Sequence, residues 1–431
     1  MAATASDGDP QILTPDQPAP VSAGDGSRLA SLDFIRGIAV LGILAANIVA
    51  FGQPFSAYMY PAAFTVPHSD AEDWMWVAQF VLIDNKMRGL FTILFGAGMM
   101  LFMEKAWARG SSRWLQARRL GWLGLFGLIH YFLIWRGDIL FSYAVCGMIA
   151  LLLVRVSGKW QLRLGLLGYL AGAILWGGMM SLMYLAADTE VGDPGAPLAD
   201  VRAGLEQGKQ DELADGVLQT EIISEGRYGD FVAHMVGEHA SDLAFFIFLW
   251  LFETLPLMLI GMALYRFGFF SGGLDPGKMK RWGWIGLLAG GAVSLLIALW
   301  VRDGGFTYYG TQAAMVGFSF LPRFAMILGL AALLALWAPT ATGWLGERLS
   351  YAGRAAFTNY LGTSVVMMLV FHGWALGLFG QLGRTELYLV VLIAWALMLA
   401  WSKPWLLKFR YGPLEWLWRC LTYGRIFPLR R

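Results

Sequence analysis

Long apolar runs recur along this chain of 431 residues and constrain its fold more than any other feature. About 18 or more apolar residues let an α-helix span roughly 30 Å of hydrocarbon. A transmembrane β-barrel would instead show short alternating segments, which the sequence lacks. The pattern predicts an all-α, polytopic membrane protein with about ten transmembrane helices. We expect them near residues 32–51, 82–103, 118–135, 139–156, 163–187, 243–265, 283–301, 312–337, 355–379 and 386–406.

The composition agrees with a membrane protein. Hydrophobic residues make up 57% of the chain and charged residues only 14%, against about 25% charged in soluble domains. The 20 Trp and 15 Tyr suit aromatic belts at two membrane interfaces. Cys146 and Cys420 lie in or beside apolar segments, so neither a disulfide framework nor a metal site is expected.

Basic residues give the orientation. Under the ten-helix count, most of the 32 Lys and Arg residues fall on one side of the membrane. By the positive-inside rule that side is cytoplasmic, with both termini inside. We therefore expect a multi-pass membrane protein with its basic loops in the cytoplasm. The basic residues in question are Arg28, those of the loops at 105–119, 155–163, 266–281 and 348–354, and those of the tail from Lys403.

The rest of the chain divides simply. Residues 1–27 are rich in Asp, Pro, Gly, Ser and Ala, which predicts a disordered cytoplasmic tail rather than a signal peptide. Residues 28–425 form a single transmembrane domain, and 426–431 a short cytoplasmic tail. The acidic loop 188–242 is external, and its stretch 197–219 predicts one or two short amphipathic helices. This loop is either a solvated cap or a lid that binds an acceptor.

The first predicted crossing holds three polar side chains. A charge near the bilayer centre costs roughly 2.5–3.5 kcal/mol, so such groups face a protein interior or an aqueous cavity. Asp33 and Arg36 share one helix face near the cytoplasmic end. Asn47 lies roughly 16 Å further along, in the outer half. Asp33 and Arg36 are either an ion pair that fixes the helix end or part of a site.

His130 reaches the same outer half as Asn47, roughly 9 Å below the outer surface. Asp138 follows a tight turn and opens the next helix, where a carboxylate suits the helix dipole. A pKa near 6.5 makes histidine a natural general base, although a buried His is often purely structural. Among the remaining histidines, we expect His68, His234 and His239 to be exposed and His372 to be buried or interfacial.

Two further groups of charges interrupt the apolar pattern. A polar break at 84–88 predicts a surface helix over 73–83, followed by the crossing proper. Lys86 and Arg88 would face the outer cavity or its rim, as interface anchors or as ligands of an anionic group. Glu253 and Arg323 lie at matching depth in two crossings and are expected to pair. The pair is either a structural lock or part of a substrate channel.

Several motifs resemble the YeiB-like bacterial membrane proteins, a domain of unknown function family (family 418). The resemblance covers residues 28–425 and implies a location in the bacterial cytoplasmic (inner) membrane. It includes the opening motif, which is Leu32-DFIRGIAVLGI-Leu44 together with Asn47. It also includes Arg354 and Asn359 in the segment Gly353-RAAFTNYL-Gly362. The other matching segments are Lys86 with 90–99, 127–130 with 135–140, 253–267 and 411–425.

The opening motif also resembles membrane acyltransferases, including the group of heparan-α-glucosaminide N-acetyltransferase. In the large bacterial acyltransferase family, Arg is followed after ten residues by a catalytic His. Here that position is Asn47, so a catalytic base must come from elsewhere. His130 is the first choice, and His68 matches an external His of the acetyltransferase only loosely.

This resemblance implies transfer of an acetyl group from cytoplasmic acetyl-CoA to an external small-molecule or glycan acceptor. His130 would act as base or transient acyl carrier, Asp138 would orient it, and Asn47 would help to hold the carbonyl oxygen. The implied substrate-binding residues are Asp33, Arg36, Lys86, Arg88, Glu253, Arg323, Arg354 and Asn359.

Two other functions stay open: a transporter of a small anionic or amphipathic solute, and a membrane scaffold or sensor. The expected partners are the lipid bilayer, the acceptor and a second copy of the chain in a homodimer. No nucleic acid is expected, because the basic residues are scattered over membrane loops.

Overall fold

The computed structural model describes residues 30–67 and 69–431, and the predicted tail 1–27, Arg28 and His68 lie outside this part. The described chain is helical, with one isolated β-bridge between Phe409 and Arg430. Its α-helices are α1 (Ala30–Gly52), α2 (Asp70–Leu82), α3 (Lys86–Trp107), α4 (Arg113–Leu133), α5 (Leu140–Leu152), α6 (Gly158–Asp188), α7 (Ala199–Ser224), α8 (Tyr228–Gly237), α9 (Asp242–Arg266), α10 (Pro276–Asp303), α11 (Tyr308–Gln312), α12 (Phe320–Trp337), α13 (Trp344–Arg354), α14 (Ala356–Phe371), α15 (Arg384–Lys408) and α16 (Pro413–Tyr423).

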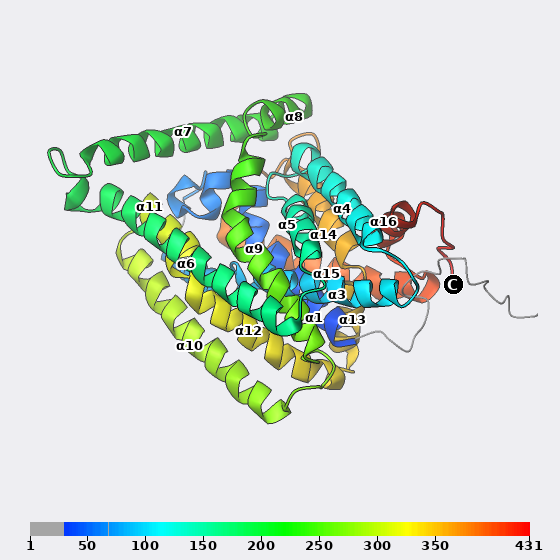
Figure 1. Ribbon diagram of the computed structural model, residues 1–431. Coiled ribbons are helices and arrows are strands. Elements are labelled where there is room, and N and C mark those ends of the chain that lie inside the picture. The colour runs from blue at the N-terminus through cyan, green and yellow to red at the C-terminus, as the bar shows by residue number, and fades with distance from the viewer. Residues whose placement is uncertain (1–29, 68) are drawn as a thin grey trace, which may run out of the picture.

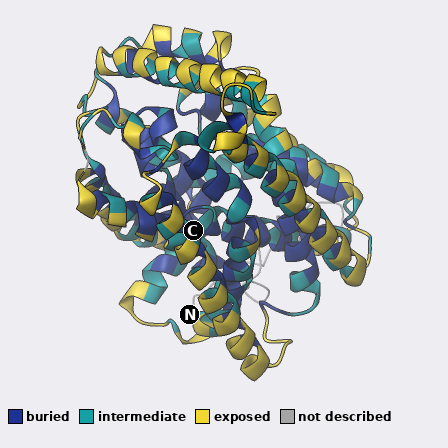
Figure 2. Ribbon diagram, turned by 90° about the vertical axis from the view of Figure 1, so that its left-hand side faces the viewer, coloured by how far each residue is buried: buried dark blue, intermediate teal, exposed yellow. Residues whose placement is uncertain are grey.

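Helix α1 is the centre of the bundle. In its most apolar window 78% of the residues are buried, against 22% in α6 and in α10. It packs against α3, α13, α14 and α15, so helices from both halves of the chain surround it. Figure 2 shows the same gradient, with buried residues in the middle and exposed residues on the peripheral helices. Polar groups on α1 therefore belong to the protein interior.

Glycines set the distance between α1 and α13. A Cβ atom on Gly353 would lie 1.8 Å from the carbonyl oxygen of Asp33, and one on Gly37 would lie 2.0 Å from that of Leu349. No side chain fits at such separations, so the two backbones touch. Small residues permit this kind of close helix approach in membrane proteins.

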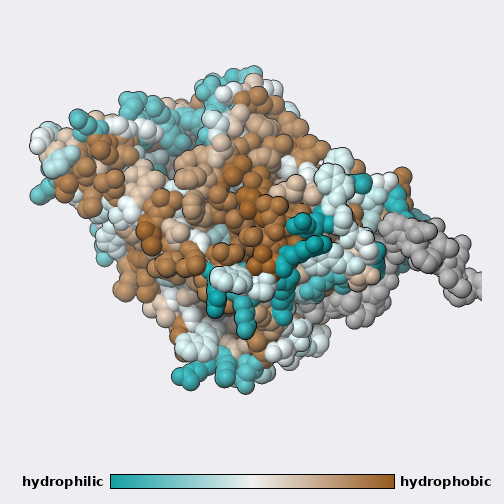
Figure 3. Space-filling model, viewed as in Figure 1, coloured by the Kyte–Doolittle hydropathy of each residue, from teal (hydrophilic) through white to brown (hydrophobic). Residues whose placement is uncertain are grey.

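The hydropathy pattern confirms a polytopic all-α membrane protein. Within the described residues, seven helical segments are long and apolar enough to cross a membrane, and one of them joins α2 and α3. Large apolar side chains such as Leu167, Leu296 and Ile393 are exposed on the outer faces of α6, α10 and α15. Figure 3, viewed from the side where α6 and α10 lie in front, shows a broad hydrophobic area between hydrophilic groups at its upper and lower edges. Every predicted crossing overlaps a helix, while the count of ten stays a prediction.

The polar break before the second crossing is confirmed. Helix α2 ends at Leu82 and α3 begins at Lys86. Asn85 between them has a φ of 60°, in the left-handed region that Asn tolerates better than most residues. The chain therefore turns where the sequence places its polar residues.

Several predicted boundaries are wrong. The crossing over 312–337 is interrupted, because α11 is followed by a π-helix over Ala313–Phe318 before α12 begins. The crossing over 355–379 stops at Phe371, the end of α14. Apolar composition cannot distinguish a π-turn, or an apolar loop, from a continuous α-helix.

The acidic loop is more regular than expected. Its main helix, α7, is one element of 26 residues rather than one or two short ones. Helices α7 and α8 lie across one end of the bundle, at the top of Figure 1. We call α7, α8 and their connections the cap (residues 189–241), and the opposite end, which carries most of the basic loops, the basic side.

Candidate functional site

A cavity opens beneath the cap. It contains about 1040 Å³ of empty space, counted to its open mouth. Aromatic side chains make up much of its wall, among them Trp135, Trp176 and Trp250. We call it the cap-side cavity. Its polar lining residues are Asn47, Asn85, Arg88, Arg136, Glu253 and Arg323.

Three charged side chains form an ion-pair triad in this wall. Arg323 Nε lies 3.0 Å from Glu253 Oε1, an ion pair without the alignment of a hydrogen bond. Arg88 Nη2 lies 2.5 Å from the other oxygen, Glu253 Oε2. The predicted Glu253–Arg323 pair is therefore confirmed, and Arg88 is its third member. Two guanidinium groups share one carboxylate, so the triad presents a net positive charge to the cavity.

The π-helix before α12 contributes to the same wall. The backbone carbonyl of Met315 accepts hydrogen bonds from Arg323 Nη1 at 2.7 Å and from Asn85 Nδ2 at 3.4 Å. A π-turn frees carbonyl groups from the regular helical pattern and is common at functional sites. Here it fixes one arginine of the triad.

A second cavity opens at the basic side and contains about 840 Å³ of empty space. Its wall contains Arg36, Arg119 and Arg354, together with apolar residues of α3, α4 and α14. Arg36 pairs with Asp33 at 3.1 Å, so these two residues of α1 bind each other. Glu415 also lies in the wall, but it accepts bonds from the backbone N–H groups of Phe357 and Thr358 at the start of α14. We call this the basic-side cavity.

Arg119 is the residue of this cavity that sequence reasoning missed. Its guanidinium lies 4.2 Å from the ring of Trp418 and 4.8 Å from that of Phe102. No carboxylate of the described residues pairs with it. In the sequence it is only one basic residue of a loop, and its aromatic neighbours come from distant segments. The stacked, unpaired guanidinium leaves its donors available for an anion.

His130 and Asp138 form a buried pair between the two cavities. His130 Nδ1 lies 2.9 Å from Asp138 Oδ1, and Asp138 Oδ2 accepts a hydrogen bond from the N–H of Phe141 at 2.8 Å. The carboxylate therefore accepts a hydrogen bond from the first turn of α5 and also orients the imidazole. His130 Nε2 is buried and has no hydrogen-bond partner among the described residues. Because a carboxylate only accepts, Nδ1 carries the proton of the neutral ring and Nε2 presents its lone pair.

The neighbours of His130 line different cavities. Its ring centroid lies 6.1 Å from that of Trp135, in the wall of the cap-side cavity, and 5.3 Å from that of Tyr360, in the wall of the basic-side cavity. A small middle cavity of about 250 Å³ is lined by both of these aromatic residues and by Asn47 and Asn359. Trp135 and Tyr360 therefore form a partition between the two large cavities, and the His130–Asp138 pair lies directly behind these two rings.

Two predicted site residues point elsewhere. The ammonium of Lys86 is buried and donates to the carbonyl of Phe80, and Lys86 does not line the cap-side cavity. Asn359 Nδ2 donates to the carbonyl of Ala352, and its Oδ1 accepts from Trp401 Nε1. Both side chains hold helices together, although Asn359 also borders the middle cavity.

The predicted exposure of His234 and His239 is wrong. His239 is buried and His234 is half-buried, because both fold beneath α7 against Asp215. Burial disfavours the charged imidazole of His239, but hydrogen bonds to Asp215 and Asp242 outweigh it and raise the pKa to about 9. A polar sequence around a histidine does not reveal that a neighbouring helix covers it. His372 is buried at the end of α14, as predicted.

The chain is 33% identical to the uncharacterized protein YeiB of Escherichia coli (strain K12), an alignment that covers 93% of this chain and 98% of that protein. It belongs to the YeiB-like family. The uncharacterized protein YxaH of Bacillus subtilis (strain 168) is 30% identical, over 94% of this chain and 96% of its own. Residues 264–425 match the family model described as "Protein of unknown function (DUF418)". No solved structure matches the chain.

The family membership leaves the chemistry open, because neither relative's name states an activity. The family-model match begins at the end of α9 and runs through α16. His130, Asp138 and Glu253 precede it and lie within the longer reach of the two relatives. The chain is thus an integral membrane protein, and its cavities are the features that bear on its activity.

Proposed function

We propose that this YeiB-like protein is a membrane acyltransferase. It moves an acyl group, acetyl in the simplest case, from acyl-CoA on the cytoplasmic side to an acceptor on the outer side. One observation carries the proposal: His130 and Asp138 form an oriented, buried pair whose free Nε2 lies behind the partition between two cavities. A general base needs this combination of a fixed tautomer and an available lone pair.

The basic-side cavity suits the donor. Under the positive-inside rule it opens to the cytoplasm, where acyl-CoA is found. Arg119 stacks between aromatic rings with its donors free, and Arg36 and Arg354 share the wall. Guanidinium groups bind phosphate through paired N–H donors, as the phosphates of coenzyme A require. The deeper wall includes Phe91 and Leu94, which match an apolar acyl thioester.

The cap-side cavity suits the acceptor. Aromatic side chains stack on sugar rings or other flat faces, and Arg88, Arg323 and Asn47 offer hydrogen-bond donors. In the transfer step, His130 Nε2 takes the proton of an acceptor hydroxyl or amine while the acceptor atom bonds to the thioester carbonyl carbon. The C–S bond then breaks, and the coenzyme thiolate receives that proton from His130. Asp138 holds the ring throughout and stabilises its charged form.

A transfer assay tests this proposal. Purified protein in detergent receives radiolabelled acetyl-CoA with a panel of amines and sugars. Wild-type protein and His372→Ala are expected to transfer label, whereas His130→Ala loses the transfer. His372 is a matched control, since it is a buried histidine that contacts Phe231 and Trp374 outside both cavity walls. Absence of coenzyme A binding and of label transfer in the wild type contradicts the proposal.

The second candidate is a transporter of a small anionic solute, and the triad favours it. Intramembrane charges often mark substrate pathways, and two arginines share Glu253 in the cap-side cavity. Saturable solute uptake into vesicles, together with no coenzyme A binding, would support this candidate. Acyl transfer without uptake would exclude it.

A further inference from the structure

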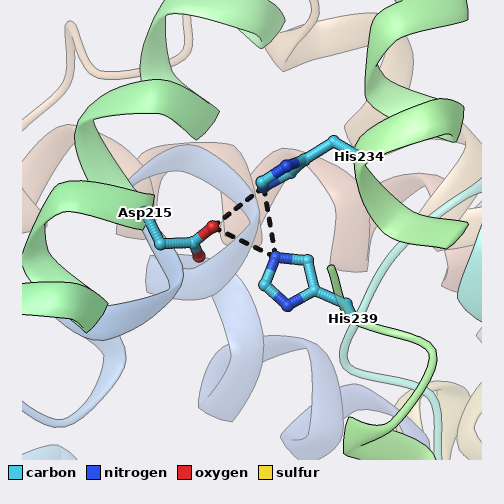
Figure 4. Close-up of side chains that lie close together, drawn as sticks. All are labelled: Asp215, His234 and His239. Carbon is cyan, nitrogen blue, oxygen red and sulfur yellow. Dashed lines mark hydrogen bonds and ion pairs between the residues drawn. The ribbon is translucent and has the colours of Figure 1, made fainter. Parts of the chain in front are cut away.

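The cap contains a cluster of side chains that neither proposed function uses. Asp215 of α7, His234 of α8 and His239 of the segment before α9 converge beneath the cap (Figure 4). Asp215 Oδ1 lies 2.9 Å from His234 Nε2 and 3.2 Å from His239 Nε2, and the two nitrogens are 3.1 Å apart. Two imidazole nitrogens, each with a lone pair once its proton is lost, therefore meet one carboxylate oxygen. Such an arrangement needs protons or a cation between them.

The three distances match one face of a metal-coordination tetrahedron. Zn–N and Zn–O bonds of roughly 2.0–2.2 Å place neighbouring tetrahedral ligands about 3.3 Å apart. The three distances, 2.9, 3.1 and 3.2 Å, lie within a few tenths of an ångström of that value. Two imidazoles and one carboxylate are also a ligand set that zinc accepts, with a fourth position for water.

The surroundings independently orient these ligands. His239 Nδ1 lies 3.0 Å from Asp242 Oδ2, so in the neutral ring Nδ1 carries the proton and Nε2 presents its lone pair to the cluster. Arg136 donates to Asp215 Oδ2 at 3.2 Å and to Asp242 Oδ2 at 2.7 Å. The arginine thus occupies the outer oxygen of Asp215 and leaves Oδ1 for the cluster. A carboxylate behind a histidine ligand is the usual second layer of a zinc site.

We propose that Asp215, His234 and His239 bind one divalent transition-metal ion of the zinc class. The ion fastens α7 and α8 to the start of α9. Arg136 joins this site to the bundle, since it also lines the cap-side cavity beneath. The metal therefore holds the cap over the mouth of that cavity. This proposal differs from the sequence-based expectation of no metal, because the three ligands come from separate elements that only folding brings together.

Metal analysis of the full chain tests the proposal without any activity assay. The protein is purified without a polyhistidine tag, stripped with a chelator, and titrated with Zn²⁺ at pH 7.5. About one tightly bound Zn²⁺ per chain is expected. His234→Ala and His239→Ala should each weaken binding at least 100-fold, whereas His372→Ala should bind like the wild type. Co²⁺ in place of Zn²⁺ should give the visible absorption of a tetrahedral site.

A conservative variant guards against misfolding. Asp215→Asn keeps the size of the side chain and one acceptor oxygen but removes the charged ligand. Zn²⁺ should raise the melting temperature of the wild type by several degrees and leave that of Asp215→Asn unchanged. Two results overturn the proposal: no binding at micromolar Zn²⁺, which leaves a metal-free network of histidines, carboxylates and Arg136, or binding that survives loss of both histidines.

Discussion

The proposed role of His130 as a base depends on which ring nitrogen carries the proton. Asp138 accepts from His130 Nδ1 and from the N–H of Phe141, so a single carboxylate fixes the tautomer of the imidazole. The lone pair on Nε2 follows from that contact and not from the burial of His130 alone. Asp138 is thus a positioning residue, and its effect should be measurable apart from that of His130.

Replacing Asp138 by Asn should lower kcat for acyl transfer by roughly 10²–10⁴-fold, the range that general-base catalysis contributes. The amide can donate to Nδ1, which favours the tautomer that protonates Nε2. The KM for acetyl-CoA should change little, because Asp138 does not line the basic-side cavity. Initial rates against acetyl-CoA concentration separate the two constants. A raised KM with an unchanged kcat would assign Asp138 to donor binding instead.

Replacing Arg119 by Gln should instead change KM for acetyl-CoA and leave kcat unchanged. Its stacked guanidinium is proposed to bind phosphate, so KM for acetyl-CoA should rise by 10-fold or more while kcat is kept. Arg113→Gln is the control, because Arg113 is exposed at the start of the same helix. Equal increases in KM for the two variants would mean that Arg119 contributes only general positive charge and no specific phosphate contact.

Replacing Glu253 by Gln tests the triad. The substitution leaves the buried Arg323 and the half-buried Arg88 with no carboxylate between them, which should cost about 3–5 kcal/mol of stability. Thermal unfolding in detergent should show a clear fall in melting temperature. An unchanged melting temperature would mean that solvent in the cap-side cavity already screens these charges.

At the element scale, close helix contacts hold the central helix in place. Gly353 of α13 touches the backbone of α1, and a methyl group there must push the two helices apart. Gly353→Ala should lower stability by about 1–3 kcal/mol, the usual cost of overpacking. Gly362→Ala on α14 is the control, since no atom lies within 4 Å of its added Cβ. Equal melting temperatures for the two variants would contradict the close contact.

The helices were largely predictable because hydropathy is a local property. Each apolar run overlaps a helix, and the polar residues at 84–88 mark the break between α2 and α3. The π-helix over Ala313–Phe318 was not predictable, since its residues look like those of the helix that follows. The length of α7 was also missed, because its polar sequence gives little periodic signal.

The candidate site was predictable only in part, for a related reason. Glu253 and Arg323 could be paired from their depths, and His130 and Asp138 from a short turn. The contacts of Arg119 with Trp418, and the cluster of Asp215, His234 and His239, join segments that are separate in sequence. Such contacts exist only once the helices pack, so no local pattern reveals them.

For the molecule as a whole, the proposed transfer requires that the two cavities open to opposite sides of the membrane. Asp200→Cys in the cap should react with an impermeant thiol reagent added to intact cells, because Asp200 is exposed. Ser271→Cys, between α9 and α10 on the basic side, should react only after the membrane is opened. The native Cys146 and Cys420 are buried and give a low background. The reverse labelling pattern would invert the topology.

In the proposed reaction, an acyl group passes between the two cavities with His130 as the base. The direct measurement uses proteoliposomes with labelled acetyl-CoA on the basic side only and acceptor on the cap side only. We expect labelled acceptor with wild-type protein, none with His130→Gln, and acetyl-CoA binding in both. Equal labelling by wild type and His130→Gln, or no labelling by a wild type that transports solute, would contradict it.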